Sequence, residues 1–135
     1  MPAKFRFGLA PLLDHRRRIA DECERRFALC RDEIRDEERA IASLCESLRV
    51  QIGQRQIGAT LAYVDSSIAA HRRRGDDLQS HLERLRDELV GARRDRRVVE
   101  KLYERRRKAY EAEVARYEEM ELDEANAALR RRPCP

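Results

Sequence analysis

The sequence is poor in proline, in aromatic residues and in long apolar runs. Its four prolines lie at positions 2, 11, 133 and 135, so no ring clash or missing N–H interrupts a helix between Leu12 and Arg132. Tryptophan is absent and aromatic residues make up 5% of the chain, which leaves little bulk for a thick core. No apolar run is long enough for a secretory signal or a membrane span. We therefore expect a helical, cytoplasmic protein with reduced thiols.

Charged residues, in contrast, are abundant. They make up 41% of the chain, against roughly 25% in an average globular domain. The 30 basic and 26 acidic residues leave a net charge of +4, and this near-balance indicates side chains paired along helix surfaces more than a surface built for phosphate. Ala, Glu, Lys, Leu and Arg supply more than half of the residues, a bias typical of coiled coils when an apolar repeat accompanies it.

An apolar repeat with alternating steps of three and four residues runs through both halves of the chain. In the first half, with Glu37 filling one position, it comprises Phe27, Cys30, Ile34, Ile41, Leu44 and Leu48. In the second half it runs from Leu61 through Val64, Ile68, His71, Gly75, Leu78, Leu82, Leu85, Leu89, Ala92, Arg96, Val99, Tyr103, Arg106, Tyr110, Glu113, Tyr117 and Met120. This spacing is that of a heptad seam.

Two glycines five residues apart, Gly53 and Gly58, separate the two seams, and Thr60 is able to cap the second helix. The pattern predicts an all-α fold in one coiled-coil domain: a first helix over about 11–52, a turn over about 53–60, a second helix over about 61–130 and a short tail. Helices joined by a short turn run antiparallel. Folding the chain about residue 55 places the acidic residues 36–38 close to the arginines 72–74.

The second predicted helix is too long for its partner, at roughly 100 Å against roughly 60 Å. We expect it to project as an arm beyond about residue 100. On this arm the seam residues Val99, Tyr103, Tyr110, Tyr117 and Met120 have no predicted surface to cover them, and an uncovered apolar stripe usually marks a docking site. Tyrosine and arginine are also enriched at binding hot spots.

The sequence gives little support for nucleotide binding, metal binding, catalysis or nucleic-acid binding. Gly53 to Thr60 approaches a phosphate-binding loop, but Ala59 stands where the lysine belongs and no strand precedes it. The cysteines and histidines lack the short spacings of a zinc site. A two-helix rod offers no dry cleft for catalytic carboxylates, so we expect neither an enzyme nor a bound cofactor or metal. Arginine triplets such as Arg105–Arg107 have acidic neighbours, which argues against nucleic-acid binding.

Short sequence blocks at both ends resemble FliJ-type proteins of the bacterial flagellum. The first is Phe5-Arg-Phe7-x-Leu9-x-x-Leu12-Leu13-x-x-Arg16, and the others are Glu100-Lys-Leu102 with its preceding arginines and the closing Leu122-Asp-Glu-Ala125. Heptad periodicity does not require the last two blocks, which makes them the more specific. The resemblance spans almost the whole chain; stalk proteins of virulence-type secretion systems are the close alternative.

The resemblance implies a non-enzymatic stalk of a type III export apparatus at the inner face of the cell membrane, without insertion into the membrane. Its partners would be the hexameric export ATPase, the cytoplasmic domain of the export gate and export chaperones. The residues implied in ATPase binding are Leu9, Leu12, Leu13, Val99, Tyr103, Arg106 and Tyr110. Those implied in gate binding are Leu48, Tyr63, Val64 and Ile68. The alternatives from other classes are a self-associating coiled-coil scaffold and a nucleic-acid-binding rod.

Overall fold

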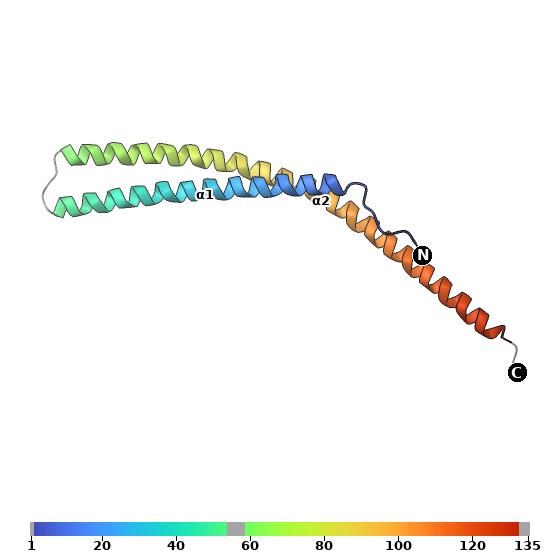
Figure 1. The fold of residues 1–135 in the computed structure, drawn as a ribbon. Helices are drawn as coiled ribbons and strands as arrows, with labels where there is room; N and C mark the ends of the chain where they lie inside the picture. Colours follow the sequence, from blue (N-terminus) through green and yellow to red (C-terminus); the bar gives the residue numbers. More distant parts are fainter. Residues whose placement is uncertain (1, 54–58, 133–135) are drawn as a thin grey trace. The chain divides into compact units, whose positions relative to one another are not determined.

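The computed structural model describes residues 2–53 and 59–132, and within them it contains two helices and no strand. Helix α1 spans Ala10–Gly53 and helix α2 spans Ala59–Arg130 (Figure 1). Each end lies within two residues of its predicted position. The predicted turn falls largely on residues 54–58, which lie outside the described part of the chain. The all-α fold with a longer second helix is confirmed.

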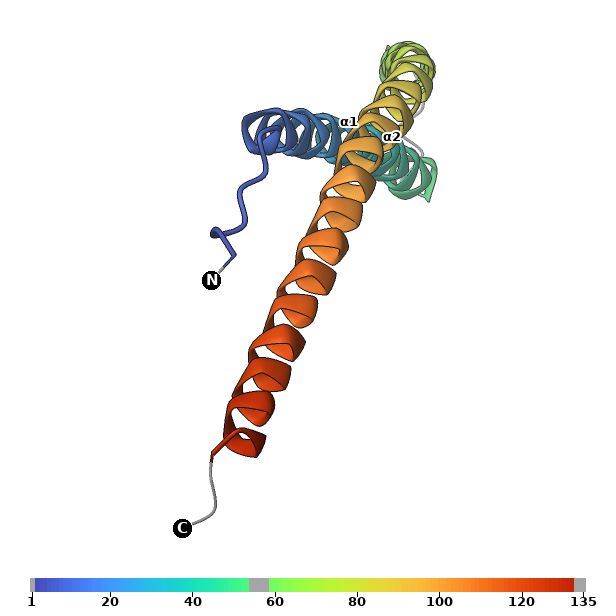
Figure 2. The same cartoon turned by 90° about the vertical axis from the view of Figure 1, so that its right-hand side faces the viewer.

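The chain divides into two compact units. The hairpin unit comprises Arg18–Arg93, and the terminal unit comprises Met1–Arg17 together with Arg94–Pro135. Because α1 and α2 are each continuous across this division, every unit contains a part of both helices (Figure 2).

In the hairpin unit, α1 and α2 run antiparallel and pack against each other through the predicted seam (Figure 1). One cluster of buried residues joins Ala20 and Cys23 of α1 to Leu89 and Ala92 of α2. A second cluster consists of Cys30, Leu82 and Leu85, with Ile34 and Leu78 packed against it. Cys30, Leu82, Leu85, Leu89 and Ala92 are residues of the predicted seams, while Ala20 and Cys23 extend the same alternation to positions before Phe27, where the sequence prediction did not place it. The burial of these side chains holds the two helices together.

The polar position predicted within the first seam is also part of the interface. Glu37 of α1 is hydrogen-bonded to Nδ1 of His71 on α2, and its other oxygen lies 3.6 Å from Nη1 of Arg74. The prediction that Glu37 and its acidic neighbours lie opposite Arg72–Arg74 is therefore confirmed for this carboxylate. The midpoint between Glu37 and Arg74 is at about residue 55, where the sequence predicted the fold-back.

In the terminal unit, α1 begins after a short non-helical segment. The N–H of Ala10 donates to the carbonyl of Phe7 at 3.0 Å, and the N–H of Leu13 donates to the carbonyl of Leu9 at 2.9 Å. Pro11 lies in the first turn, where a missing N–H leaves no helical hydrogen bond unmade. The non-helical segment itself, residues 2–9, contacts α2 through its aromatic side chains.

Candidate partner-binding site

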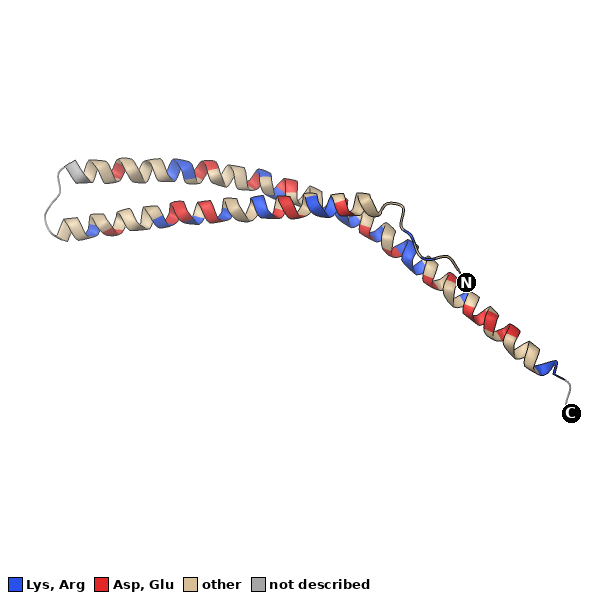
Figure 3. Cartoon of the chain, in the orientation of Figure 1, with Lys and Arg blue, Asp and Glu red and all other residues tan. Residues whose placement is uncertain are grey.

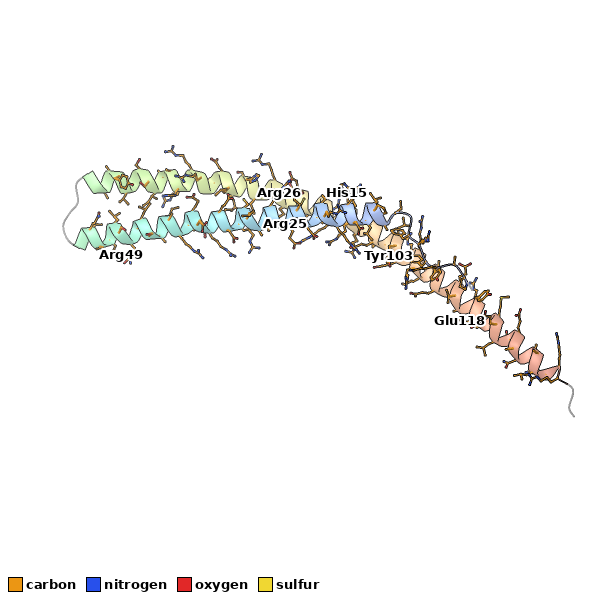
Figure 4. All side chains as sticks on the ribbon, in the orientation of Figure 1. His15, Arg25, Arg26, Arg49, Tyr103 and Glu118 are labelled. Carbon is orange, nitrogen blue, oxygen red and sulfur yellow. The ribbon has the colours of Figure 1, made fainter. Side chains whose placement is uncertain are left out.

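An aromatic cluster lies in the terminal unit, between the non-helical segment and α2. The ring of Phe5 lies 5.7 Å from that of Tyr103 and 5.3 Å from that of Tyr110, measured between centroids. Phe7 meets Tyr103 edge-on at 5.2 Å. Edge-to-face contacts of this kind stabilise beyond the area that they bury. The segment thus contacts α2 at two positions that lie about two helical turns apart, Tyr103 (labelled in Figure 4) and Tyr110.

Beneath the rings lies a small apolar core. Phe7, Leu13 and Val99 are buried, with 8%, 5% and 7% of their surface exposed, and Leu9, Leu102 and Tyr103 pack against them. The sequence predicted that no surface of the chain covers the apolar stripe of α2. For its first three residues, Val99, Tyr103 and Tyr110, this prediction is wrong. Phe5, Phe7 and the first turn of α1 cover this part of the stripe, whereas Met120, farther along it, is 60% exposed.

Two arginines close the cluster on its outer side. The guanidinium of Arg106 lies 5.5 Å from the centre of the Phe7 ring, and that of Arg107 lies 5.1 Å from the centre of the Phe5 ring. Both distances suit a cation–π interaction. Arg107 also donates to Glu111 at 3.1 Å, which fixes its side chain along α2. The cluster therefore presents cations and ring edges, and little bare aliphatic surface, to a partner.

Ion pairs flank this core on the α1 side. Arg16 donates to Asp95 at 3.3 Å, and Arg17 lies 3.6 Å from Glu100, a carboxylate that Arg96 approaches at the same distance. All these groups are at least partly exposed, so each pair contributes at most roughly 1 kcal/mol. They join Arg16 and Arg17 of α1 to Asp95 and Glu100 of α2 beside the core.

The structure brings six of the seven residues implied in ATPase binding into one place. Leu9, Leu13, Val99 and Tyr103 belong to the apolar core, while Arg106 and Tyr110 contact the phenylalanine rings that cover it. The seventh, Leu12, has 37% of its surface exposed and is absent from the core. Leu13 and Val99, at 5% and 7% exposed, are too deeply buried to touch a partner directly.

The four residues implied in gate binding belong to the hairpin unit, and their exposure differs widely. Val64 is 3% exposed, and Tyr63, its neighbour, is 69% exposed. Leu48 and Ile68 are half-buried at the seam. Of these, Tyr63 is the side chain most accessible to a partner.

Three further exposed apolar side chains near Gly53 of α1 and Ala59 of α2 are not among the residues implied in gate binding. Val50 and Ile52 are each 51% exposed, and Leu61 is 37% exposed. Val50 and Ile52 fall off the three-four alternation after Leu48, and this break in register was the available signal.

Past Tyr110, α2 carries exposed apolar side chains on more than one face. Met120, Leu122 and Leu129 are exposed to 60%, 61% and 61%. At about 100° per residue, Leu122 and Leu129 lie on the opposite side of the helix from Met120. Acidic residues dominate this stretch, with Glu118 labelled in Figure 4 and the alternation of charge along α2 visible in Figure 3.

No group of three or more His, Cys, Asp or Glu side chains is arranged to hold a metal ion within the described residues. Cys23 and Cys30 are buried free thiols, and Cys45 is an exposed one. Burial of the thiol, and secondarily the carboxylate of Glu33, raises the pKa of Cys30 above its ordinary value. The Cys30 sulfur lies 3.4 Å from the carbonyl of Leu78, so it acts as a small core residue.

The model of the family described as "Flagellar FliJ protein" matches residues 5–133, which is nearly the whole chain. The chain belongs to the FliJ family. No curated protein and no solved structure shows significant similarity to it. Membership makes this FliJ-family chain a component of the flagellar export apparatus and not an enzyme. No helix in the described residues is long and apolar enough to cross a membrane.

Proposed function

We propose that this chain is the coiled-coil stalk that binds the hexameric export ATPase, promotes its assembly or activity, and links it to the export gate and to export chaperones. In this proposal it acts in the cytoplasm, at the inner face of the cell membrane. The family assignment indicates that the chain is a component of the flagellar export apparatus. The features of the terminal unit support the particular role within it.

The observation that carries the proposal is the distribution of apolar side chains on α2 beyond Tyr110. Met120 and Leu122 lie on opposite sides of the helix, and each leaves about three fifths of its surface exposed. A flat partner or a single partner helix could cover one of these sides but not both. A partner that surrounds the helix covers them together, and the central opening of a ring-shaped ATPase has this geometry.

The aromatic cluster, which contacts α2 at Tyr103 and Tyr110, is also suited to binding the ATPase. Its rigid rings and guanidinium groups carry the residue types that dominate binding energy at protein interfaces. In this proposal Leu12, Arg106 and Tyr110 contact the ATPase, while Leu13 and Val99 hold them in position. Tyr63, with Leu48, Val64 and Ile68 behind it, forms the proposed contact with the gate.

The test is ATP hydrolysis and ring assembly by the purified export ATPase with and without this chain. The test variant is Met120→Gln/Leu122→Gln, and the control is Leu29→Gln/Val90→Gln, which replaces two apolar residues of the hairpin unit that are 61% and 48% exposed. We expect the intact chain and the control to stimulate the ATPase and the test variant to lose most of the stimulation.

Equal loss in the test and control variants would show that exposed apolar residues act without regard to place, and would contradict the assignment of the site to α2. No stimulation by the intact chain, together with a stable homodimer in sedimentation, would favour the self-associating scaffold instead.

A further inference from the structure

The seam of the hairpin unit is not closed equally along its length. Its clusters of buried side chains end at the level of Ile34 and Leu78. Beyond that level, toward the predicted turn, Val64 is the only described side chain that is buried. We name this part the distal hairpin, and it comprises residues 41–53 of α1 and 59–70 of α2. Its other described seam residues are half-buried or exposed.

Two apolar side chains on the seam side of the distal hairpin remain in contact with solvent. Ile52 lies four residues after Leu48, and Leu61 lies three residues before Val64, so both point toward the seam side of their helix. They are nevertheless 51% and 37% exposed, whereas Leu85 within the buried clusters is 5% exposed. The ribbons of α1 and α2 also draw apart toward this end (Figures 1 and 2). The two helices therefore pack incompletely here.

The level between the buried clusters and the distal hairpin is occupied by polar and small residues. Glu37 of α1 lies there against His71 and Arg74 of α2. Gly75 contributes no side chain, and a Cβ added to it would have no described side chain within 4 Å. An open groove of about 230 Å³ follows this level, with Ile34 among its lining residues. The apolar seam is thus interrupted, which allows the two sides of the interruption to open separately.

The distal hairpin also has less support from ion pairs and from helix propensity than the rest of the hairpin unit. Among its described residues the one ion pair joins Arg49 to Glu46 within α1, at 3.8 Å. The pair between Arg93 and Glu24, which joins α1 to α2 at 3.1 Å, has no counterpart among the described residues of the distal hairpin. Serine favours a helix less than alanine does. Four of the five serines of the chain lie in the distal hairpin, at positions 43, 47, 66 and 67.

We propose that the distal hairpin opens and closes as a unit while the buried clusters of the hairpin unit stay paired. In the open form α1 and α2 separate beyond Glu37 and His71, and the side chains of Leu48, Val64 and Ile68 leave the seam. The separated ends unwind in part, because most helical stability in proteins comes from packing. Since little apolar surface is buried in the distal hairpin, opening costs much less free energy than unfolding of the clusters.

The inference rests on the proposed function in one respect, the identity of the partner. Leu48, Val64 and Ile68 belong to the proposed contact with the gate, but Val64 is 3% exposed and cannot reach a partner while the hairpin is closed. Opening brings these side chains to the surface beside Tyr63. The gate then binds the open form, and its apparent affinity is proportional to the fraction of chains that are open.

The first test is hydrogen exchange of the full chain, in water and in urea well below the unfolding transition. The amides of residues 44–50 and 63–70 are compared with those of 23–33 and 79–89. After correction for intrinsic rates, we expect the distal amides to exchange at least about tenfold faster, with one common rate and a weaker dependence on urea, since opening exposes less surface than global unfolding. Equal rates and equal urea dependence in both sets overturn the proposal, as does a steady fall in rate away from the turn with no common value.

Exposed serines provide matched variants for a second test. Ser47→Ala/Ser66→Ala raises helix propensity in both helices of the distal hairpin, and Ser80→Ala makes the same kind of change on α2 beside the buried clusters. The double variant should lower the open fraction, and with it the distal exchange rate, about fivefold. Ser80→Ala should leave distal exchange unchanged. Slower distal exchange in Ser80→Ala would mean that the distal hairpin opens only with the whole unit, which overturns the proposal.

Binding of the purified cytoplasmic domain of the gate separates this inference from the proposed function. The double variant should bind the gate domain about fivefold more weakly than the intact chain, because its open fraction is lower by that factor. Ser80→Ala should bind like the intact chain. Unchanged binding by the double variant, with slower distal exchange, overturns the claim that the gate binds the open form. Local opening without any binding of the gate domain contradicts the proposed gate contact and leaves the opening itself unaffected.

Discussion

The hairpin unit and the terminal unit are stabilised by different kinds of side chain. The hairpin unit is joined mainly by small and aliphatic residues, such as Ala20, Cys30 and Leu85, that interlock along a heptad seam, with the ring of Phe27 packed beside them. The terminal unit is joined by phenylalanine and tyrosine rings with guanidinium groups stacked on them. In the first, two regular helices supply both surfaces of the interface; in the second, a segment without regular structure supplies one of them.

This difference has a physical consequence. Helix pairing by a seam repeats at every turn, so its stability is spread over many similar contacts. The non-helical segment instead depends on two rings, Phe5 and Phe7, and its loss would expose Val99 and Tyr103 at once. We therefore expect the hairpin unit to respond to core substitutions globally and the terminal unit to respond locally.

The largest effect is expected for Leu85→Ala in the hairpin unit. Leu85 is 5% exposed and packs in the cluster with Cys30 and Leu82, so its truncation leaves a cavity and should lower the free energy of unfolding by about 2–4 kcal/mol. Urea denaturation followed by circular dichroism measures this. Leu29→Ala, at a position 61% exposed, is the control and should change stability by well under 1 kcal/mol. Similar losses in both variants would argue that the seam does not dominate stability.

The next largest effect is expected for Phe7→Ala in the terminal unit. This change removes the ring that meets Tyr103 and covers Val99, and it should make local opening easier by about 2–3 kcal/mol. Hydrogen exchange should speed up in residues 10–17 and 95–105 and stay unchanged in the hairpin unit. Phe5→Ala, which removes a less buried ring, should show the same pattern more weakly. Faster exchange throughout the hairpin unit would mean that the two units unfold together and do not differ in their response.

The packing of the hairpin unit could be predicted from the sequence because a single three-four repeat of apolar residues sets its contacts. The three-four alternation placed Cys30, Leu82 and Leu85 on facing stripes, and it placed Glu37 opposite the arginines near His71, because one period determines every contact. Helix ends followed from the positions of proline and glycine. Periodicity could not reveal a contact made by a segment of the chain that has no repeat.

The cover over the tyrosine stripe is such a contact. Phe5, Phe7 and Leu9 alternate with other residues just before Pro11, which marks them as apolar on one side, but no repeat connects them to Val99 or Tyr103, almost a hundred residues away. The pairing depends on where α1 begins and on the chain direction before it.

A smaller effect is expected at the polar position of the hairpin seam. His71→Leu leaves the half-buried carboxylate of Glu37 with Arg74 alone and should destabilise the chain by about 1 kcal/mol. Glu37→Leu/His71→Leu restores an apolar seam and should be more stable than the intact chain by about 1–2 kcal/mol, since replacing a polar pair by packed apolar residues is often stabilising. A double-mutant cycle in urea measures both. If the double variant is the least stable of the set, the polar pair contributes to stability as well as to register.

The smallest effect is expected for the exposed ion pairs, of which each unit offers a matched example. Arg16 donates to Asp95 at 3.3 Å in the terminal unit, and Arg93 donates to Glu24 at 3.1 Å in the hairpin unit, with all four side chains between 38% and 58% exposed. Asp95→Asn and Glu24→Gln should each cost no more than about 0.5 kcal/mol, and the cost should vanish at about 1 M salt. Equal, salt-sensitive losses of stability would show that exposed ion pairs contribute the same amount in both units. The difference between the units would then lie in their buried packing. A cost above about 1 kcal/mol for Asp95→Asn alone, persisting in high salt, would instead mean that the ion pair and the aromatic cluster act together in holding the non-helical segment on α2.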